Sequence, residues 1–341
     1  MRLLVVTQVV DSKDSVLGAY HAWLRELAKH FEHIEVVCLF EGEHALPENV
    51  QVHSLGKEKA VSPSYVYAFR FMRFAWSLRN QYDSVLVHMN QEYILLAGVL
   101  WKFLGKPIYL WRNHFAGSWL TDVAAAFCTK VYCTSKHSYT AKYRKTELMP
   151  VGVNLERFTQ TASVRREPKS ILFLARIAPS KRPDVLIEAL GILLAKGVSF
   201  VASVYGSALP ADAAYLENLK SRVEILGLHD RVRFYPSVPN EKTPEVFQAH
   251  ELFVNCSPSG MFDKTLFEAA ASGCLVLAAS EDWRDHAGEA AWFDGTSEGL
   301  ADRLSEVLTT SEAFEAAEAE SHSLASLGSA LAASIGASGQ L

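Results

Sequence analysis

The residues best suited to chemistry in this sequence include two cations in its second half. Arg176 follows the apolar segment 171–175, and Lys181 lies five residues further on, where a helix-prone segment begins. A strand-end arginine and a lysine near a helix N-terminus gather positive charge and free N–H groups around one point. Such a point suits a diphosphate, and its positive charge would stabilise the negative charge that develops on a departing phosphate oxygen.

Two carboxylates, Asp263 and Glu268, lie in the stretch 255–280. Within it a strand end, a Ser-Pro-Ser-Gly turn and a helix predicted over 264–271 follow one another. Ligands of open parallel sheets bind outside the carboxyl ends of the strands, so we expect the loop and the first helical turn to face a binding crevice. Glu268 can accept hydrogen bonds from both hydroxyls of a ribose. Asp263 is either the N-cap of the helix or a contact to sugar hydroxyls, and one residue can do both.

Strand-like segments alternate with helix-prone segments along most of the chain, which is typical of a doubly wound α/β fold. In the first half we predict strands at 3–6, 34–39, 50–53, 84–88 and 108–111, and helices at 19–31, 65–79 and 92–104. The second half repeats the pattern, with strands at 171–175, 200–205, 232–235, 252–254 and 275–279, and helices near 185–194, 216–226, 245–250, 264–271 and 298–308.

These elements predict two Rossmann-like domains. We assign the first domain to 1–158 and the second to 171–310. The segment 159–170 is polar and has no apolar periodicity, so we expect it to be the linker between them. The segment 311–341 is rich in Ala and Ser, and we predict a weakly packed helical tail that frays at its end.

Composition restricts the class of protein. The chain has 341 residues, 49% of them apolar, and a net charge of −5, which gives no overall reason to expect a nucleic-acid partner. No segment approaches the ~18 apolar residues that cross a bilayer, and no signal-peptide pattern opens the chain, so we expect a cytoplasmic protein. The five cysteines have no zinc spacing, and we predict buried free thiols.

The helix predicted at Tyr65–Arg79 combines six aromatic residues with three arginines. Such a helix suits a membrane surface that carries anionic lipid, which would place the protein at the inner face of the membrane. The alternative is an ordinary helix that covers the sheet and turns its arginines to water. A helix is required at this point of the alternation in either case.

The stretch 255–280 resembles the donor-site signature of the retaining family-4 glycosyltransferases. That signature is a serine-proline loop, two glutamates eight positions apart and a small-residue helix that ends in Gly. Glu268 occupies the place of the second glutamate, whereas Gly260 stands in the place of the first. Asp263 and Lys264 replace a Gly and an apolar residue of the family pattern.

Other segments carry the same resemblance in the same order along the chain. Arg176 and Lys181 match the family's phosphate-binding Arg and Lys, although Ala175 and Arg182 replace its glycines. Gly206 matches a glycine-containing loop after a strand. The segment 149–158 matches the turn that ends the family's first domain.

The resemblance implies a GT-B fold, with the donor nucleotide mainly on the second domain and the acceptor mainly on the first. It implies that His114, at a strand end, lies near the acceptor and the reacting sugar; His88 competes for this role. A lone Gly18 before the first helix either only lets the chain turn or lets N–H groups approach a diphosphate. The residues expected at the donor are Gly18, Arg176, Lys181, Gly206, Gly260, Met261, Phe262, Asp263, Lys264 and Glu268, and those expected in catalysis are His114, Arg176, Lys181 and Asp263.

We therefore expect a glycosyltransferase that moves a sugar from a nucleotide-diphosphate sugar to a glycan or lipid-linked acceptor. The family implies retention at the anomeric carbon. No D-x-D motif is present to carry a metal on the diphosphate, so we expect transfer without a metal, and we expect no cofactor. The first turn also lacks a G-x-G-x-x-G, which disfavours a nicotinamide enzyme. Two alternatives stay open: a catalytically silent nucleotide-sugar-binding protein of a polysaccharide assembly complex, suggested by Gly260, and a sugar-nucleotide epimerase of the same fold.

Overall fold

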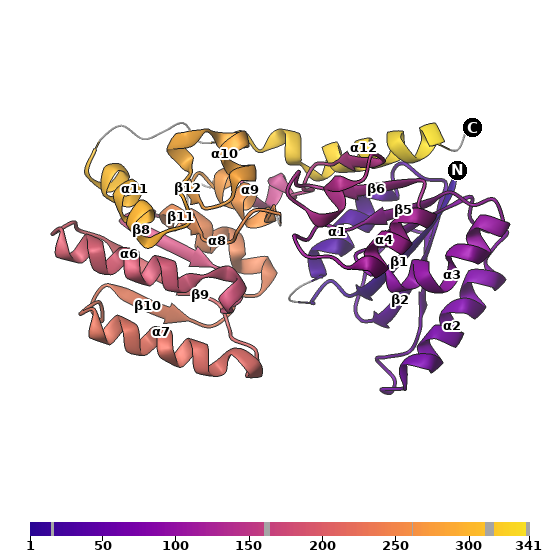
Figure 1. The fold of residues 1–341 in the computed structure, drawn as a ribbon, viewed down its shortest axis with the longest axis horizontal. Coiled ribbons are helices and arrows are strands. Elements are labelled where there is room, and N and C mark those ends of the chain that lie inside the picture. The colour runs from indigo at the N-terminus through magenta and orange to yellow at the C-terminus, as the bar shows by residue number, and fades with distance from the viewer. Residues whose placement is uncertain (15–16, 160–163, 261, 311–316, 339–341) are drawn as a thin grey trace. The chain divides into compact units, whose positions relative to one another are not determined.

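The computed structural model describes residues 1–14, 17–159, 164–260, 262–310 and 317–338, and these form two compact units (Figure 1). The first unit comprises Met1–Gly152 together with the C-terminal part from His322 onward, and the second comprises Val153–Ser321. Each unit is built around one parallel sheet with helices on both faces, so the predicted α/β class with two doubly wound domains is confirmed.

The sheet of the first unit has seven parallel strands in the order β3-β2-β1-β4-β5-β6-β7. At its centre Val5 lies opposite Val36 on one side and Leu86 on the other. These central strands are continuous apolar segments because helices cover both faces of the sheet. The strands are β1 (Arg2–Val10), β2 (His33–Glu41), β3 (Val50–Ser54), β4 (Ser84–His88), β5 (Ile108–Trp111), β6 (Lys130–Cys133) and β7 (Thr146–Leu148).

The sheet of the first unit separates two hydrophobic clusters, one beneath the helices on each of its faces. Leu4 and Val6 point to one face of the sheet, where they pack with α2, α3 and α4. Leu3 and Val5 point to the other face, where they pack with α1 and α12. The helices are α1 (Gly18–Leu27), α2 (Ser64–Ser77), α3 (Glu92–Phe103), α4 (Trp119–Phe127), the 3₁₀ turn η1 (Tyr139–Lys142) and α12 (Leu324–Ser338).

The C-terminal helix α12 belongs to the first unit and is firmly packed, so the prediction of weak packing is wrong. Leu327, Leu331 and Ile335 are buried against the core of the first unit. The Tyr109 hydroxyl donates to the Ile335 carbonyl at 3.2 Å, and the hydroxyls of Tyr132 and Ser334 lie 2.9 Å apart. The segment has few large apolar residues, but they recur every four positions and therefore share one face of the helix.

The second unit has five parallel strands in the order β10-β9-β8-β11-β12. They are β8 (Glu167–Leu174), β9 (Val201–Tyr205), β10 (Val232–Tyr235), β11 (His250–Asn255) and β12 (Leu275–Ala278). The helices are α5 (Leu155–Phe158), α6 (Pro183–Ala195), α7 (Ala213–Ile225), α8 (Thr243–Gln248), α9 (Lys264–Ala271), α10 (Glu281–Ala287) and α11 (Ser297–Thr309), with 3₁₀ turns η2 (Pro179–Lys181), η3 (Pro210–Asp212), η4 (Asn240–Lys242) and η5 (Glu289–Ala291). The 3₁₀ turn η6 (Glu320–His322) spans the boundary to the first unit.

The boundary between the units differs from the predicted one. The second unit begins at Val153, and the ring of Phe158 packs inside it against Phe247, with centroids 6.0 Å apart. Strand β8 begins at Glu167, inside the predicted linker 159–170, of which 160–163 lie outside the described residues. The first three residues of β8 are exposed, which explains why the sequence shows no apolar pattern there.

The packing of α12 predicts a large effect of truncating one of its leucines. Leu331→Ala should lower the free energy of unfolding by about 2–5 kcal/mol, because it leaves a cavity in a fully buried site. Urea denaturation followed by tryptophan fluorescence measures this, since five of the seven tryptophans lie in the first unit. Leu148→Ala is the matched control, because Leu148 is 58% exposed. Equal effects of the two substitutions would contradict the packing described here.

Candidate functional site

The sheet of the second unit changes direction between β8 and β11. The chain runs from β8 outward through β9 to β10, then returns to the other side of β8 with β11 and continues to β12. Strands β8 and β11 are neighbours, with Leu252 opposite Ile171. The loops that leave their carboxyl ends therefore part in opposite directions, and an open α/β sheet binds its ligands at such a point. The loop after β8 carries Arg176 and Lys181, and the loop after β11 leads to Asp263.

Lys181 and Asp263 join these two loops. The Lys181 Nζ lies 2.7 Å from the Asp263 Oδ2, and it also donates to the Ser257 Oγ at 3.3 Å. The two charged side chains are only 19% and 23% exposed. The structure thus brings together two predicted site residues that are 82 positions apart in the sequence.

Asp263 occupies the N-cap position of α9, but its side chain makes no capping hydrogen bond, so the capping interpretation is wrong. Its Oδ2 instead accepts from the Asn255 Nδ2 at 3.2 Å and the Ser257 Oγ at 3.0 Å, in addition to Lys181. Within the part of the chain that the structure describes, these bonds all end on Oδ2 and none on Oδ1. Sequence reasoning missed Asn255 as a partner, although a polar residue that ends a buried strand was a usable signal.

The loop between β11 and α9 is fixed at Gly260. Its φ of +95° is one that side-chain-bearing residues rarely adopt, so a glutamate at this position would strain the backbone. The Gly260 N–H donates to the Asp282 Oδ2 at 3.2 Å, and the Glu281 N–H donates to the Ser259 Oγ at 2.9 Å. The loop is therefore anchored to the first turn of α10. Met261, a predicted donor contact, lies outside the described residues.

Glu268 is a buried carboxylate one turn into α9. Its side chain is 7% exposed, and the Lys264 Nζ lies 3.5 Å from its Oε1. This cation lies one helical turn before the glutamate, so the pair spans i and i+4. Phe262 is also buried, and its ring packs against Phe267 with centroids 5.0 Å apart. Its side chain thus contributes to an aromatic core, which the sequence interpretation of Phe262 as a donor contact did not anticipate.

The backbone around Arg176 and Lys181 is tightly constrained at Arg182 and Gly206. Arg176 is exposed and lies two residues after the end of β8. Arg182 has φ of +49°, a left-handed conformation that costs a non-glycine residue roughly 1 kcal/mol or more. At Gly206, which follows β9, an added Cβ would lie 1.9 Å from the Ala175 carbonyl oxygen. The ends of β8 and β9 approach so closely that only glycine fits there.

In the first unit the corresponding change of direction lies between β1 and β4. Gly18 begins α1 after the loop that leaves β1. An added Cβ would lie 3.0 Å from the Ser12 carbonyl oxygen, and the Gly18 N–H already donates to the Asp14 carbonyl at 3.0 Å. Both observations favour the interpretation that Gly18 lets the chain turn.

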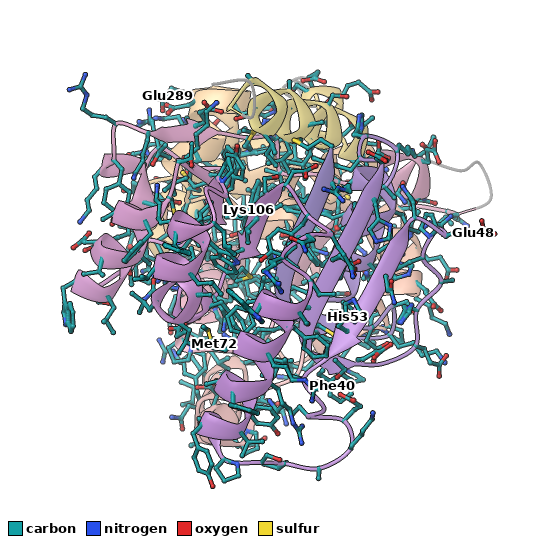
Figure 2. The ribbon with its side chains drawn as sticks, turned by 90° about the vertical axis from the view of Figure 1, so that its right-hand side faces the viewer. Phe40, Glu48, His53, Met72, Lys106 and Glu289 are labelled. Atoms are coloured by element: carbon teal, nitrogen blue, oxygen red, sulfur yellow. The ribbon has the colours of Figure 1, made fainter. Side chains whose placement is uncertain are left out.

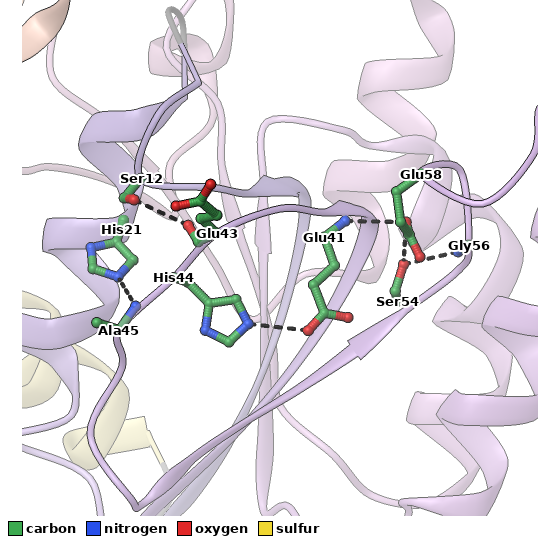
Figure 3. A network of polar contacts seen from close by, with 9 residues as sticks. All are labelled: Ser12, His21, Glu41, Glu43, His44, Ala45, Ser54, Gly56 and Glu58. Carbon is green, nitrogen blue, oxygen red and sulfur yellow. Dashed lines mark hydrogen bonds and ion pairs between the residues drawn. The ribbon is translucent and has the colours of Figure 1, made fainter.

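A polar network occupies the carboxyl ends of β2 and β3 (Figure 3). The Glu58 carboxylate accepts from the Ser54 hydroxyl at 2.7 Å and from the Glu41 N–H at 3.2 Å. The His44 Nε2 lies 3.1 Å from the Glu41 Oε1. Burial alone would raise the pKa of Glu58, but the hydrogen bond from Ser54 and those from backbone N–H groups lower that pKa below its ordinary value. These groups bond one another at this edge of the sheet.

Two histidines compete for a role in proton exchange, and their surroundings differ. The His88 ring is buried and stacks on Tyr20 with centroids 3.8 Å apart, and its Nδ1 lies 3.2 Å from the Thr7 hydroxyl. Burial lowers the pKa of His88 to about 3, so it is neutral at physiological pH and closed to substrate. His114 is partly exposed, stacks on Phe115 and lies 2.9 Å from the Ala116 N–H.

The described residues contain neither a metal-binding cluster nor a membrane-spanning helix. They include no group of three or more His, Cys, Asp or Glu side chains placed to hold a metal ion. No helix among them is long and apolar enough to cross a membrane. The five cysteines are buried and free, as predicted.

Comparison with known proteins shows what the second unit is similar to. Residues 156–316 match the family model described as Glycosyl transferases group 1. This part of the chain is similar to the group 1 glycosyltransferases. It is similar in sequence to the D-inositol 3-phosphate glycosyltransferase of Streptomyces avermitilis, with 35% identity over 155 residues that cover 42% of this chain and 33% of that protein. It is also similar to the mannosylfructose-phosphate synthase of Agrobacterium fabrum, with 31% identity over 147 residues that cover 40% and 32%. The match thus spans about a third of the length of these curated relatives.

Solved structures show a similarity of fold over the whole chain. Anabaena Alr3699/HepE, crystallised with UDP and glucose, aligns with a TM-score of 0.73 and 17% identity over 100% of this chain and 97% of its own. WaaG, a glycosyltransferase involved in lipopolysaccharide biosynthesis, aligns with a TM-score of 0.68 and 15% identity over 98% and 99%. At this identity the alignments show the fold alone, and that fold is the predicted GT-B fold.

The buried His88 predicts a pH dependence of stability. Its folded pKa of about 3 lies below the unfolded value of 6.5, so the unfolded chain takes up a proton first as the pH falls. The stability that neutral His88 provides is complete above pH 6.5 and decreases as the pH falls toward 3, with about 2 kcal/mol lost at pH 5. Urea denaturation at pH 7.5 and pH 5 measures this loss. His88→Gln should reduce the difference between the two pH values, whereas His229→Gln, an exposed control, should not. An unchanged difference in His88→Gln would contradict the assignment.

Proposed function

We propose that this protein transfers a sugar from a nucleotide-diphosphate sugar to a glycan or lipid-linked acceptor, and that the second unit binds the donor where β8 and β11 part. The observation that carries this proposal is the meeting of Lys181 and Asp263 at the direction change of a group 1 glycosyltransferase sheet. The crystal structures of HepE contain UDP or UDP-glucose, which makes uridine nucleotides the first donors to test.

Arg176 and Lys181 would bind the diphosphate. Among the described residues, none makes a hydrogen bond or an ion pair with the Arg176 side chain, so its charge is available to a ligand. Lys181 is held in place by Asp263 and can turn one more N–H toward a phosphate oxygen. In transfer, both cations would stabilise the charge on the leaving diphosphate, which supports a reaction without a metal. Gly206 would let the donor approach the backbone closely.

Glu268 would hold the ribose of the donor. Its carboxylate is buried on α9, and among the described residues its one ionic partner is Lys264, at the long distance of 3.5 Å. A carboxylate has about four acceptor positions, so Lys264 leaves most of them open to two ribose hydroxyls. Lys264 would hold the carboxylate in position while the ribose is bound.

Asp263 would replace the family's first glutamate beside the transferred sugar. Gly260 has no side chain to offer, and its φ of +95° opposes one. Asp263 is already anchored through Oδ2, which leaves Oδ1 to accept a hydrogen bond from a sugar hydroxyl. The backbone of Gly260 and Phe262 would complete this side of the donor site.

The first unit would bind the acceptor. His114 is its proposed proton-exchanging residue, because the competing His88 is buried with a pKa of about 3. Gly18 would only let the chain turn into α1, because its N–H already donates to the Asp14 carbonyl. Retention at the anomeric carbon follows from the family resemblance. Neither a silent binding protein nor an epimerase is supported by the comparisons.

Donor binding predicts a nucleotide-dependent thermal shift. A nucleotide sugar at ~100 times its dissociation constant should stabilise the native protein by about 2.7 kcal/mol, and Glu268→Ala should lose most of that shift because ribose contacts disappear. A panel of nucleoside diphosphates and their sugars, measured by thermal unfolding, tests this. Glu188→Ala is the matched control, because Glu188 also lies on a helix of the second unit and pairs with a cation, Arg222. The absence of a shift with every nucleotide would refute the proposed function.

The geometry at Asp263 predicts that Asp263→Asn separates sugar binding from diphosphate binding. The variant should lose at least tenfold in affinity for the nucleotide sugar, since it loses a charged contact to a hydroxyl. It should keep or improve its affinity for the nucleoside diphosphate, because Lys181 no longer shares its charge with a carboxylate. Calorimetric titration with both ligands measures the two affinities. If the variant retains its donor affinity and turnover, Asp263 has no sugar contact.

A further inference from the structure

The first unit exposes an unusual share of large apolar side chains on three adjacent helices. Nine of the sixteen exposed large hydrophobic residues in the described part of the chain lie on α2, α3 and α4. They are Tyr65, Phe69, Trp76, Leu96, Val99, Phe103, Trp119, Leu120 and Val123. We call this set the three-helix surface. An exposed apolar surface of this extent marks an interaction site.

The spacing along α2 shows why these side chains face outward together. Tyr65, Phe69 and Trp76 are separated by four and seven residues and lie on one side of the helix. Phe71 and Ala75, on the opposite side, are buried in the core. The predicted sheet-covering role of α2 is therefore confirmed for its inner face, whereas its outer face carries three aromatic rings.

The outer faces of α3 and α4 continue this surface. On α3, Leu96, Val99 and Phe103 are exposed at the spacing i, i+3, i+7, while Ile94 and Trp101 are buried. The inner faces of α2, α3 and α4 share one core cluster, so the outer faces look to the same side of the sheet (Figure 1). In Figure 2, Met72 marks α2 and Lys106 marks the turn after α3, and these helices stand beside the strands of the sheet.

The charges on the three-helix surface are mostly positive. Helix α2 contains no acidic residue, and its Arg73 is exposed. Arg79 lies directly after α2, with its guanidinium 4.2 Å from the centre of the Trp76 ring. Lys102 is exposed on α3. Of the two acids on these helices, Asp122 pairs with Lys142 at 2.7 Å, which leaves Glu92 as the exposed negative charge.

We propose that the three-helix surface binds an anionic lipid bilayer, with its helices lying in the plane of the interface. Trp and Tyr are enriched at such interfaces because one side of the ring is apolar and one end is polar. Each basic residue near the surface strengthens binding by about fivefold. A symmetric dimer through this surface would bring Arg73 and Lys102 against the same cations of a second copy, which disfavours that occupant.

This surface lies on the first unit alone, and the inference does not depend on the proposed transferase activity. If both hold, the bilayer contact would bring the acceptor side of the enzyme to lipid-linked substrates. A vesicle-binding assay needs no turnover and no nucleotide. Its failure and the failure of donor binding are therefore distinguishable.

The experiment is co-sedimentation of the full chain with phosphatidylcholine vesicles, with and without phosphatidylglycerol. The wild type should pellet with the anionic vesicles only, and high salt should release it. Phe69→Ser/Phe103→Ser removes two rings that are 73% and 85% exposed, and it should weaken binding by at least tenfold. Arg73→Glu/Lys102→Glu should weaken binding by about 25-fold or more.

Matched substitutions on the second unit serve as controls. Leu209→Ser/Ile225→Ser removes two exposed apolar side chains, and Arg233→Glu reverses an exposed charge. Both controls should bind vesicles like the wild type. Absence of wild-type binding to anionic vesicles, or equal loss in the controls, would overturn the proposal. So would light scattering that shows a dimer which Phe69→Ser/Phe103→Ser dissociates, since a second copy would then cover the surface.

Discussion

The ion pair between Lys181 and Asp263 connects the two loops on which the candidate donor site depends. These loops leave neighbouring strands in opposite directions. A partly buried ion pair recovers its desolvation cost only with further hydrogen bonds, and here Asn255 and Ser257 supply them. Without a ligand, the carboxylate balances the lysine. A bound diphosphate would compete for the same cation.

This arrangement also gives the missing glutamate a physical interpretation. The backbone conformation at this position favours glycine. Gly260 adopts a φ of +95°, and its N–H is bonded to Asp282. The loop follows a course that would strain any side chain at that point. In the proposed donor site, the negative charge would instead come from Asp263, three residues later, which pairs with Lys181.

Much of this structure could be predicted from local sequence. Alternating apolar segments located most strands of both sheets, and strand-end residues located Arg176 and Lys181 at the direction change. The side-chain partners could not be predicted in this way. Asp263 is a favoured cap by residue type, but a lysine 82 positions away provides a stronger partner than a helix N–H. The first residues of β8 were likewise missed, although a strand was predicted from residue 171, because exposed residues leave no apolar pattern.

The return of α12 to the first unit explains the turn at Gly152. This glycine has φ of +78°, and an added Cβ would lie 2.4 Å from a methyl group of Leu327 and 2.9 Å from the Trp23 Nε1. The Trp23 Nε1–H donates to the Gly152 carbonyl at 3.0 Å, and the Gly152 N–H donates to the His322 carbonyl at 3.0 Å. The chain thus leaves the first unit and re-enters it at neighbouring points. The turn at Gly152 could be predicted from a short motif. The contacts that fix it come from a helix more than 170 residues later, and the motif itself gives no information about them.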